Sequence, residues 1–238
     1  MSFVSKVFSK TALLVGSVAI LAGSLVSAQS MIQNCKPGYV AITYDDGPNI
    51  YTSELVKLLD SNGVKATFFI NGDNFLQLND SVIAQEALKD AYNSGHQIAS
   101  HTWSHQNLDE IDGSKFDSEI VKLEQIVQQF VGKRPAYIRP PYGAASETTV
   151  KKLNDKGYQV IEWSTDTKDY ESHNTETEIE HVKGSFTKAN LDNGFIILAH
   201  DVYEQTTTDL TKALIKYIKG EGFKFCTVAE CVGQPAYK

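Results

Sequence analysis

The chain has 238 residues, of which 42% are hydrophobic and 21% are charged. These proportions are typical of one globular domain, or two at most, with a sizeable apolar core. The formal net charge is −7, and no segment is rich in lysine and arginine. The acidic balance argues against nucleic acids and anionic membrane surfaces as partners.

Residues 1–28 have the pattern of a secretory signal peptide. A basic start with two lysines precedes an apolar stretch over residues 12–26, and small residues lead to a cleavage position after Ala28. An uncleaved membrane anchor is the alternative, but the stretch is shorter than the ~20 residues that a spanning helix needs. Cleavage would change the formal charge from −7 to −9, because it removes two lysines and no acidic residue. We expect a secreted protein, extracellular or in the cell wall, with one domain over residues 33–238.

One pattern recurs along the expected domain. An amphipathic stretch ends at a glycine, which suits the left-handed conformation after a helix, and a short run of β-branched and aromatic residues follows. The polar stretch over residues 168–177 predicts a loop. The predicted strands cover residues 39–43, 66–70, 97–99, 137–138, 158–163, 195–198 and 223–228, and the predicted helices cover residues 55–59, 84–92, 120–131, 150–156, 179–191 and 210–218.

The alternation of strands and helices predicts an α/β protein with a parallel sheet. A closed barrel and an open doubly wound sheet both have this alternation. The first strand is followed by the acidic pair Asp45 and Asp46, and not by a glycine-rich phosphate loop. We therefore favour an irregular (β/α) barrel of seven or eight units. In such folds the active site forms where the strands end and the loops begin.

Reactive side chains follow most of the predicted strands. Because the carboxyl ends of parallel strands meet at one rim, we expect these side chains to lie together. They are Asp45 and Asp46 after the first strand, His101 and His105 after the third, Arg139 after the fourth, Asp166 and Asp169 after the fifth, and His200 after the sixth.

The two histidines that follow the third strand suggest a metal site. His101 and His105 are four residues apart, a spacing that places both imidazoles on one face of a helical turn. Two histidines and a carboxylate from another strand end would leave positions open for water and substrate, as a catalytic zinc site requires. Asp45 and Asp46 are adjacent, so one can bind the metal while the other acts as general base. An ordinary exposed turn is the alternative for this acidic pair.

Two further strand ends offer groups that could assist catalysis. Arg139 is followed by two prolines, which stiffen the loop, and Tyr142 after them keeps an N–H that could face an oxyanion. The alternative is a structural turn with Arg139 in a surface ion pair. His200 could protonate a leaving group, or it could be a packed core histidine. His96, at the start of the third strand, is expected to lie at the opposite end of the barrel in a structural role.

Three cysteines remain after the expected cleavage site, at Cys35, Cys226 and Cys231. Export makes one disulfide plausible. A bridge between Cys35 and Cys231 would join the two ends of the domain and leave Cys226 as a buried thiol, whereas pairing of Cys35 with Cys226 is the alternative. Asn79 begins a glycosylation sequon, which has meaning only in a eukaryotic host.

Five ordered segments resemble the motifs of the carbohydrate esterase family 4 polysaccharide deacetylases, which share the NodB homology domain. The resemblance covers nearly all of the chain after the expected signal peptide, and the two segments around Cys35 and Cys231 are most similar to those of secreted fungal chitin deacetylases. The five motifs are Thr43-Tyr44-Asp45-Asp46-Gly47-Pro48, Ser100-His101-Thr102-Trp103-Ser104-His105, Arg139-Pro140-Pro141-Tyr142-Gly143, Asp166-Thr167-Lys168-Asp169-Tyr170 and Leu198-Ala199-His200-Asp201.

The resemblance implies a role for each motif residue at the metal. Asp45 would be the catalytic base, and Arg139 would orient it or tune its basicity. Asp46, His101 and His105 would bind a divalent ion, usually zinc, with cobalt or another divalent ion as the alternative. The resemblance thus divides the acidic pair into one base and one ligand.

The resemblance also implies an acid and a substrate-facing set. His200 would be the acid, and Asp169 would support the charged network around Arg139 or His200. The Tyr142 N–H would face the oxyanion, and Leu198 would line the pocket for the acetyl methyl group. Tyr170 stands where the family commonly has tryptophan, which puts substrate preference in doubt and not catalysis. The implied substrate or oxyanion residues are Tyr142, Leu198, Tyr170 and Trp103.

The function implied is hydrolysis of the N-acetyl group of N-acetylglucosamine units in chitin or its oligomers, giving chitosan and acetate. Peptidoglycan deacetylase and acetylxylan esterase are the alternatives among enzymes. An inactive chitin-binding protein is the alternative of another class, although the intact set of acid, base and ligands argues against it. The expected partner is a chitin saccharide, with no nucleic acid or membrane, and the expected state is a monomer.

Overall fold

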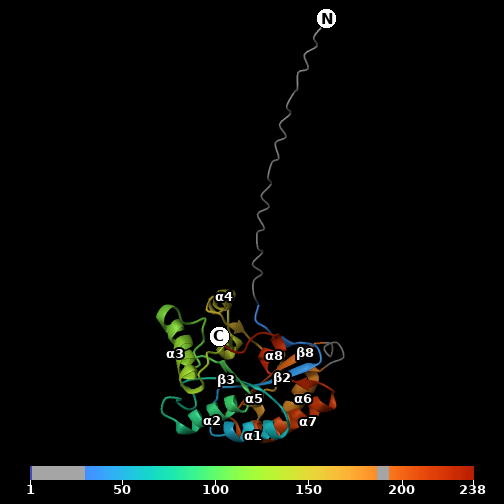
Figure 1. Ribbon diagram of the computed structural model, residues 1–238. Helices are drawn as coiled ribbons and strands as arrows, with labels where there is room; N and C mark the ends of the chain where they lie inside the picture. The colour runs from blue at the N-terminus through green and yellow to red at the C-terminus, as the bar shows by residue number, and fades with distance from the viewer. Residues whose placement is uncertain (2–29, 187–192) are drawn as a thin grey trace.

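The computed structural model describes residues 1, 30–186 and 193–238 (Figure 1). The expected signal peptide over residues 1–28 lies outside the described residues, apart from residue 1. The same is true of the last part of the helix predicted over residues 179–191. No helix in the described ranges is long and apolar enough to cross a membrane.

One mixed sheet organises the chain, and its strands alternate with helices as the sequence predicts. The sheet curls as an irregular barrel, in agreement with the prediction (Figure 1). Strand β1 is antiparallel to β8, and the other pairings are parallel. The main order is β1 (Asn34–Cys35), β8 (Gly194–His200), β2 (Tyr39–Asp45), β3 (Thr67–Ile70), β4 (Gln97–Ser100), β5 (Tyr137–Ile138) and β6 (Gln159–Val160), while β7 (Thr165–Asp166) pairs with β8 and β9 (Lys224–Phe225) pairs with β2.

Helices pack around this sheet, and in Figure 1 α1, α2, α6 and α7 lie together on its lower side. Contacts between α1 and α2 and between α6 and α7 join them into a layer. Two short elements also occur, a 3₁₀ turn over Pro141–Gly143 and a π-helical turn over Thr206–Leu210. The α-helices are α1 (Thr52–Ser61), α2 (Val82–Asn93), α3 (Gly113–Val131), α4 (Glu147–Asp155), α5 (Asp169–Ser172), α6 (Thr175–Ser185), α7 (Thr211–Gly220) and α8 (Val228–Val232).

Two predicted segments differ from the structure for the same reason. The expected loop over residues 168–177 contains α5 and the start of α6, and the predicted strand over residues 223–228 ends early and passes into α8. Asn174 caps α6 by accepting a hydrogen bond from the Thr177 N–H, and Thr227 begins α8 with a capping box that includes Glu230. Polar capping residues therefore start helices where polarity alone suggested a loop or a strand end.

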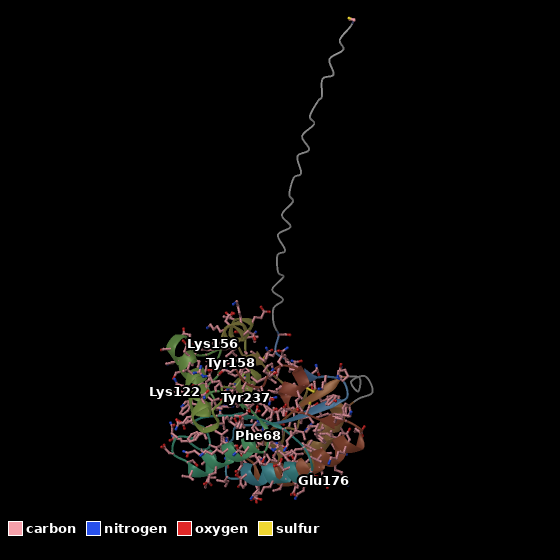
Figure 2. The ribbon with its side chains drawn as sticks, viewed as in Figure 1. Phe68, Lys122, Lys156, Tyr158, Glu176 and Tyr237 are labelled. Carbon is pink, nitrogen blue, oxygen red and sulfur yellow. A yellow bond between two sulfur atoms is a disulfide. The ribbon has the colours of Figure 1, made fainter. Side chains whose placement is uncertain are left out.

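The alternation of side chains along β2 separates the core from the site. Val40, Ile42 and Tyr44 belong to the apolar cluster between the sheet and the helices, where Tyr44 stacks on Phe68 at 5.5 Å between ring centroids. Phe68 lies near the middle of the molecule in Figure 2. Ala41 belongs to a second apolar cluster, on the opposite face of β2. Side chains alternate along a strand with a period of two, so the next two residues on the Ala41 face of β2 also point to the inside of the curled sheet. The inner face is therefore apolar at the amino end and polar at the carboxyl end.

A disulfide joins Cys35 of β1 to Cys231 of α8, which are 196 residues apart. The alternative partner, Cys226, is a buried free thiol whose Sγ lies 3.4 Å from the Cys35 Sγ. Burial raises the pKa of the Cys226 thiol to about 12, so it is protonated at neutral pH. The bridge therefore ties the first strand of the sheet to the last described helix.

Candidate metal centre and active site

Two of the expected catalytic residues lie side by side on neighbouring strands. In the parallel ladder between β2 and β8, Asp45 is the direct partner of His200, and Thr43 is the partner of Leu198. Asp45 is 2% exposed and His200 is partly buried. The strand ends therefore bring an acidic side chain and an imidazole to the same rim, as the sequence predicts.

Three side chains converge beside this pair and could hold a metal ion. The ligand atoms of Asp46, His101 and His105 all lie within 4.8 Å of one another. Asp46 Oδ1 is 3.6 Å from His101 Nε2 and 3.3 Å from His105 Nε2. One carboxylate oxygen and two imidazole nitrogens are a donor set that suits zinc and similar divalent ions.

The protonation of the two histidines suits metal binding. His101 Nδ1 is 2.7 Å from the backbone carbonyl of Arg139, so this nitrogen carries the proton and Nε2 keeps its lone pair. Burial lowers the pKa of His101 to about 3 and that of His105 to about 4. Burial also raises the pKa of Asp46 to about 6. At neutral pH both imidazoles are neutral and Asp46 is ionised, which is the state that ligands require.

The expected helical turn at the two histidines is wrong. The segment after β4 is a loop in which Thr102 and His105 have left-handed backbone angles, with φ values of 74° and 56°. Bonds from other elements hold this loop. Asn71, which follows β3, donates to the carbonyls of His101 and Thr102 at 2.6 and 2.9 Å. Glu119 of α3 accepts from both the N–H and the hydroxyl of Ser104, at 2.8 and 2.6 Å.

Arg139 is a buried group that fixes Asp45. The guanidinium is fully buried and donates from Nη1 to Asp45 Oδ1 and to Thr43 Oγ1, both at 2.7 Å. It also donates from Nη2 to the Glu162 carbonyl at 3.0 Å and lies over the Phe69 ring at 4.2 Å. Burial raises the pKa of Asp45, while the charge of Arg139 and its hydrogen bond oppose this effect. Arg139 therefore binds one oxygen of Asp45, and the other, Oδ2, lies 3.8 Å from His101 Nε2.

Asp169 supports His200, and not Arg139. Its carboxylate accepts from the His200 backbone N–H at 2.8 Å, lies 2.7 Å from His200 Nδ1, and accepts from the Thr206 hydroxyl at 2.9 Å. Burial alone would lower the pKa of His200, but the hydrogen bond and the negative charge of Asp169, with Asp45 and Asp46, outweigh it and raise the pKa to about 9. His200 is therefore protonated at neutral pH, with Nε2 directed away from Asp169.

Two exposed tyrosines stand beside the reactive groups. Tyr142 is 68% exposed, has a left-handed φ of 63° and packs its ring edge-on against His105, with 4.7 Å between centroids. Tyr170 is 42% exposed, donates to Asp166 at 3.0 Å and lies 5.5 Å from the His200 ring. Leu198 is buried in β8 and is paired with Thr43. Two exposed rings thus flank the reactive groups, while Leu198 is a buried residue of the strand that carries His200.

Trp103 and His96 have packing contacts that account for their positions. The Trp103 ring lies against Gly72 so closely that a Cβ there would overlap it, and Lys122 lies over the ring at 5.8 Å. These contacts give the Trp103 ring a packing role beside the histidine loop. His96 is buried at the start of β4, and its Nδ1 accepts from the Ala66 N–H at 3.0 Å, which fits a structural role.

Three residues that support the site were given no role from the sequence, although Asp201 was part of the fifth motif. Asn71 and Glu119 hold the histidine loop, and Asn71 could have been found because it is the first polar residue after the apolar strand β3. The third is Asp201, which is fully buried, accepts from the Thr52 hydroxyl at 2.5 Å, and lies so close to Gly47 that a Cβ there would overlap its carboxyl group. Glycine is therefore required directly after Asp46. Glu119 had no local signal, because it lies inside a regular helix.

Comparisons with known proteins agree with this geometry. The family model for polysaccharide deacetylases matches residues 33–161. A chitin deacetylase of Colletotrichum lindemuthianum is 35% identical, over 94% of this chain and 92% of that protein. A probable peptidoglycan-N-acetylglucosamine deacetylase of Arthroderma benhamiae is 40% identical over 89% of this chain, although the match spans only 48% of that protein.

The fold is also similar to that of a chitin deacetylase. The solved structure of the Colletotrichum lindemuthianum chitin deacetylase superposes with a TM-score of 0.82 at 34% identity, covering 90% of this chain and 97% of that one. The resemblance found in the sequence and the predicted barrel are thus both confirmed. The chain belongs to the polysaccharide deacetylase family.

Proposed function

We propose that this protein is a metal-dependent chitin deacetylase, which hydrolyses the N-acetyl groups of N-acetylglucosamine units and releases acetate. One observation carries the proposal. At the carboxyl end of one sheet lie a carboxylate bound by Arg139 and a protonated imidazole. The three side chains that could bind a metal ion converge beside them. The similarity to a chitin deacetylase over nearly its whole length supports chitin as the substrate.

Asp46, His101 and His105 are the residues that would hold the ion, and we propose zinc, with cobalt(II) as the alternative. When bound, a divalent ion polarises a carbonyl and lowers the pKa of a water molecule. The chain contributes a neutral imidazole pair, an ionised carboxylate and a loop that Asn71 and Glu119 fix in place. These contacts position the loop that carries both proposed histidine ligands.

Asp45 is the proposed base. Its Oδ2 takes a proton from the attacking water as the new carbon–oxygen bond forms, while its Oδ1 stays bound to Arg139. Burial raises the pKa of Asp45, which makes its carboxylate a stronger base than an exposed aspartate. The oxyanion that develops on the substrate would accept from the Tyr142 N–H, a role that the rigid left-handed turn at Tyr142 supports.

His200 is the proposed acid. Its Nε2 gives a proton to the sugar nitrogen as the carbon–nitrogen bond breaks, so acetate and the free amine leave. The Asp169 contact holds Nδ1 and keeps the ring protonated up to a pH of about 9. Base and acid are thus separate residues with opposite protonation states, which one deacetylation step needs.

The alternative substrate is peptidoglycan, because a relative that is 40% identical has that name. Acetylated xylan is a third candidate substrate, because an esterase acting on it would use the same metal site. The deciding experiment measures acetate release from chitin oligomers, peptidoglycan and acetylxylan, with and without a chelator. We expect release from chitin oligomers to be fastest, to stop with chelator and to return with zinc. Chitin binding without acetate release, even with added zinc, would mean a binding protein instead.

We also propose that the protein is secreted, to the extracellular space or the cell wall. The signal peptide pattern supports export, and so does the disulfide between Cys35 and Cys231, because such bonds persist in oxidising compartments. A monomer is the proposed state. Secretion is tested by finding the processed chain, beginning after Ala28, in the medium of the expressing cell.

A further inference from the structure

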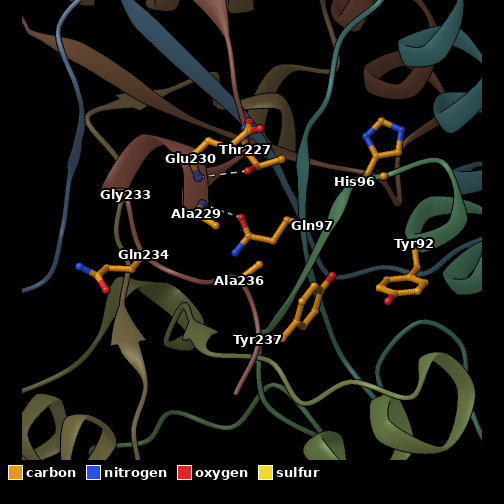
Figure 3. A pocket seen from close by; sticks show the side chains of 11 residues that line it. Tyr92, His96, Gln97, Thr227, Ala229, Glu230, Gly233, Gln234, Ala236 and Tyr237 are labelled. Atoms are coloured by element: carbon orange, nitrogen blue, oxygen red, sulfur yellow. Dashed lines mark hydrogen bonds between the residues drawn. The ribbon is translucent and has the colours of Figure 1, made fainter.

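The amino end of the sheet has a cavity of about 660 Å³ that the proposed reaction does not use. Its walls come from the end of α2, the start of β4, and α8 with the residues after it (Figure 3). Strand β4 begins at Gln97 in this wall and ends one residue before His101. Four strand residues span about 13 Å, so the cavity and the metal ligands lie at opposite ends of one strand.

Gln97 has a buried donor that faces this cavity. It is 3% exposed, and its Oε1 accepts from the Thr67 hydroxyl at 3.0 Å and from the Ala229 N–H at 2.8 Å. The Ala229 N–H can only donate, so it fixes which end of the amide is the oxygen. The remaining group, Nε2, has no hydrogen-bond partner in the part of the chain that the structure describes. Figure 3 shows this nitrogen pointing toward Ala236, within the cavity. A buried donor without an acceptor is unfavourable, so an acceptor from outside the protein fits here.

The other lining groups restrict the charge and shape of the ligand. Glu230 is the one acidic residue among the described lining residues, and its side chain accepts from the Thr227 N–H at 2.8 Å. A negative lining disfavours an anion. Tyr92 and Tyr237 pack edge to face at 5.9 Å, and the Tyr237 oxygen accepts from the Ile98 N–H at 3.1 Å, which fixes that ring beside β4. Fixed aromatic rings beside an amide donor suit a neutral, oxygen-rich ring with apolar faces, as a sugar has.

We propose that this cavity is a second saccharide site, which binds one N-acetylated sugar unit at the end of the barrel opposite the metal centre. The acetamide carbonyl of the sugar accepts from Gln97 Nε2, and the sugar ring lies against the tyrosines. The choice of an N-acetylated sugar rests on the proposed function, whereas the requirement for an acceptor rests on Gln97 and its neutrality rests on Glu230. Such a site would keep a polymer on the enzyme between reactions.

The test uses the full chain with the substitution Asp45→Asn, so that the probe is not consumed. N,N′,N″-Triacetylchitotriose is titrated while the amide signals are followed by NMR, including the Gln97 side-chain NH₂. We expect saturable shifts at Gln97 and over residues 229–237, separate from those over residues 101–105. Cellotriose has similar rings without acetamides and should bind the cavity at least about tenfold more weakly, because the carbonyl acceptor is missing.

Two variants test the assignment. Ala236→Phe fills the cavity and should abolish the shifts there while leaving those over residues 101–105. Gln97→Glu keeps an oxygen for Thr67 and Ala229 but replaces the donor, and should weaken cavity binding about tenfold. Shifts confined to the metal rim, or cavity shifts that survive in both variants, would overturn the proposal and leave a cavity that holds only water.

The proposed function is checked separately by acetate release from the same trisaccharide. Without the Asp45 substitution, Ala236→Phe should release acetate from this short probe at an unchanged rate. Cavity binding in a chain that releases no acetate would disprove the deacetylase and support the second site. Acetate release without cavity binding would support the deacetylase and disprove the second saccharide site.

Discussion

At the scale of single residues, three of the reactive side chains have one atom bound to the protein and another directed to the reaction centre. Arg139 binds Asp45 Oδ1, the Arg139 carbonyl binds His101 Nδ1, and Asp169 binds His200 Nδ1. The remaining atoms are Oδ2 of the proposed base, Nε2 of a proposed ligand and Nε2 of the proposed acid. These bonds therefore orient all three side chains, and at His200 the bond to Asp169 also raises the pKa.

The base assignment predicts the result of Asp45→Asn. The amide has no basic oxygen, so kcat should fall by about 10²–10⁴-fold, while bound metal is retained because the three ligand residues are unchanged. Acetate release and elemental analysis of the purified protein measure the two effects. Asp109→Asn, at an exposed carboxylate that accepts from Ser146, is the matched control and should leave both unchanged. A variant at position 45 that keeps most of its activity would show that another group is the base.

The acid assignment predicts a pH profile. His200 must be protonated to act, so activity should fall as pH rises through its pKa of about 9. In Asp169→Asn the negative charge that raises this pKa is lost, and the fall should begin at lower pH. The rate of acetate release against pH measures both. Thr206→Val removes a hydrogen bond to Asp169 without changing its charge and should shift the profile much less. An alkaline limb that does not move in Asp169→Asn would contradict the role of His200.

At the scale of elements, the site depends on bonds between segments that are distant in sequence. The histidine loop follows β4, but Asn71 after β3 and Glu119 within α3 hold its backbone. The left-handed angle at Thr102 is unfavourable for a β-branched residue, so these bonds must stabilise it. The loop is consequently a product of three elements.

Weakening the α3 contact should therefore weaken metal binding. Glu119→Ala removes both bonds to Ser104, and we expect about 10–100-fold lower metal affinity, as is usual for groups that orient ligands. Competition with a chromophoric chelator measures it. Glu119→Gln keeps one oxygen acceptor and should lose less, and Glu54→Ala on the exposed face of α1 should lose nothing. Equal metal affinity in Glu119→Ala and the native protein would show that the loop holds its own shape.

The sequence predicts the strands and the strand-end residues well, because the two-residue and helical periods are local signals. Asp45, His101, Arg139 and His200 could be placed at one rim from topology alone. The backbone of the histidine loop could not, because Asn71 and Glu119 act across long sequence distances. The starts of α6 and α8 were missed because their capping residues, Asn174 and Thr227, have the composition of loops.

At the scale of the whole molecule, the disulfide between Cys35 and Cys231 joins the first strand of the sheet to α8, near the other end of the chain. Its removal in a double variant, Cys35→Ser with Cys231→Ser, should lower the free energy of unfolding by about 2–5 kcal/mol, because the unfolded chain regains a long loop. Urea unfolding measures this. Cys226→Ser changes only the buried free thiol and should cost clearly less. If that single variant is as unstable as the double one, the bridge does not contribute in this way.

The register between β2 and β8 has a consequence for how such an enzyme can diversify. Asp45 and His200 are partners in one ladder, so backbone hydrogen bonds on either side set their separation, and neighbouring strands lie about 4.8 Å apart. The exposed rings of Tyr142 and Tyr170 are outside that ladder. Substitutions in the loops can thus change which polymer binds, while the distance between the proposed base and acid stays the same. Relatives named for chitin and for peptidoglycan are what this separation of chemistry from recognition would produce.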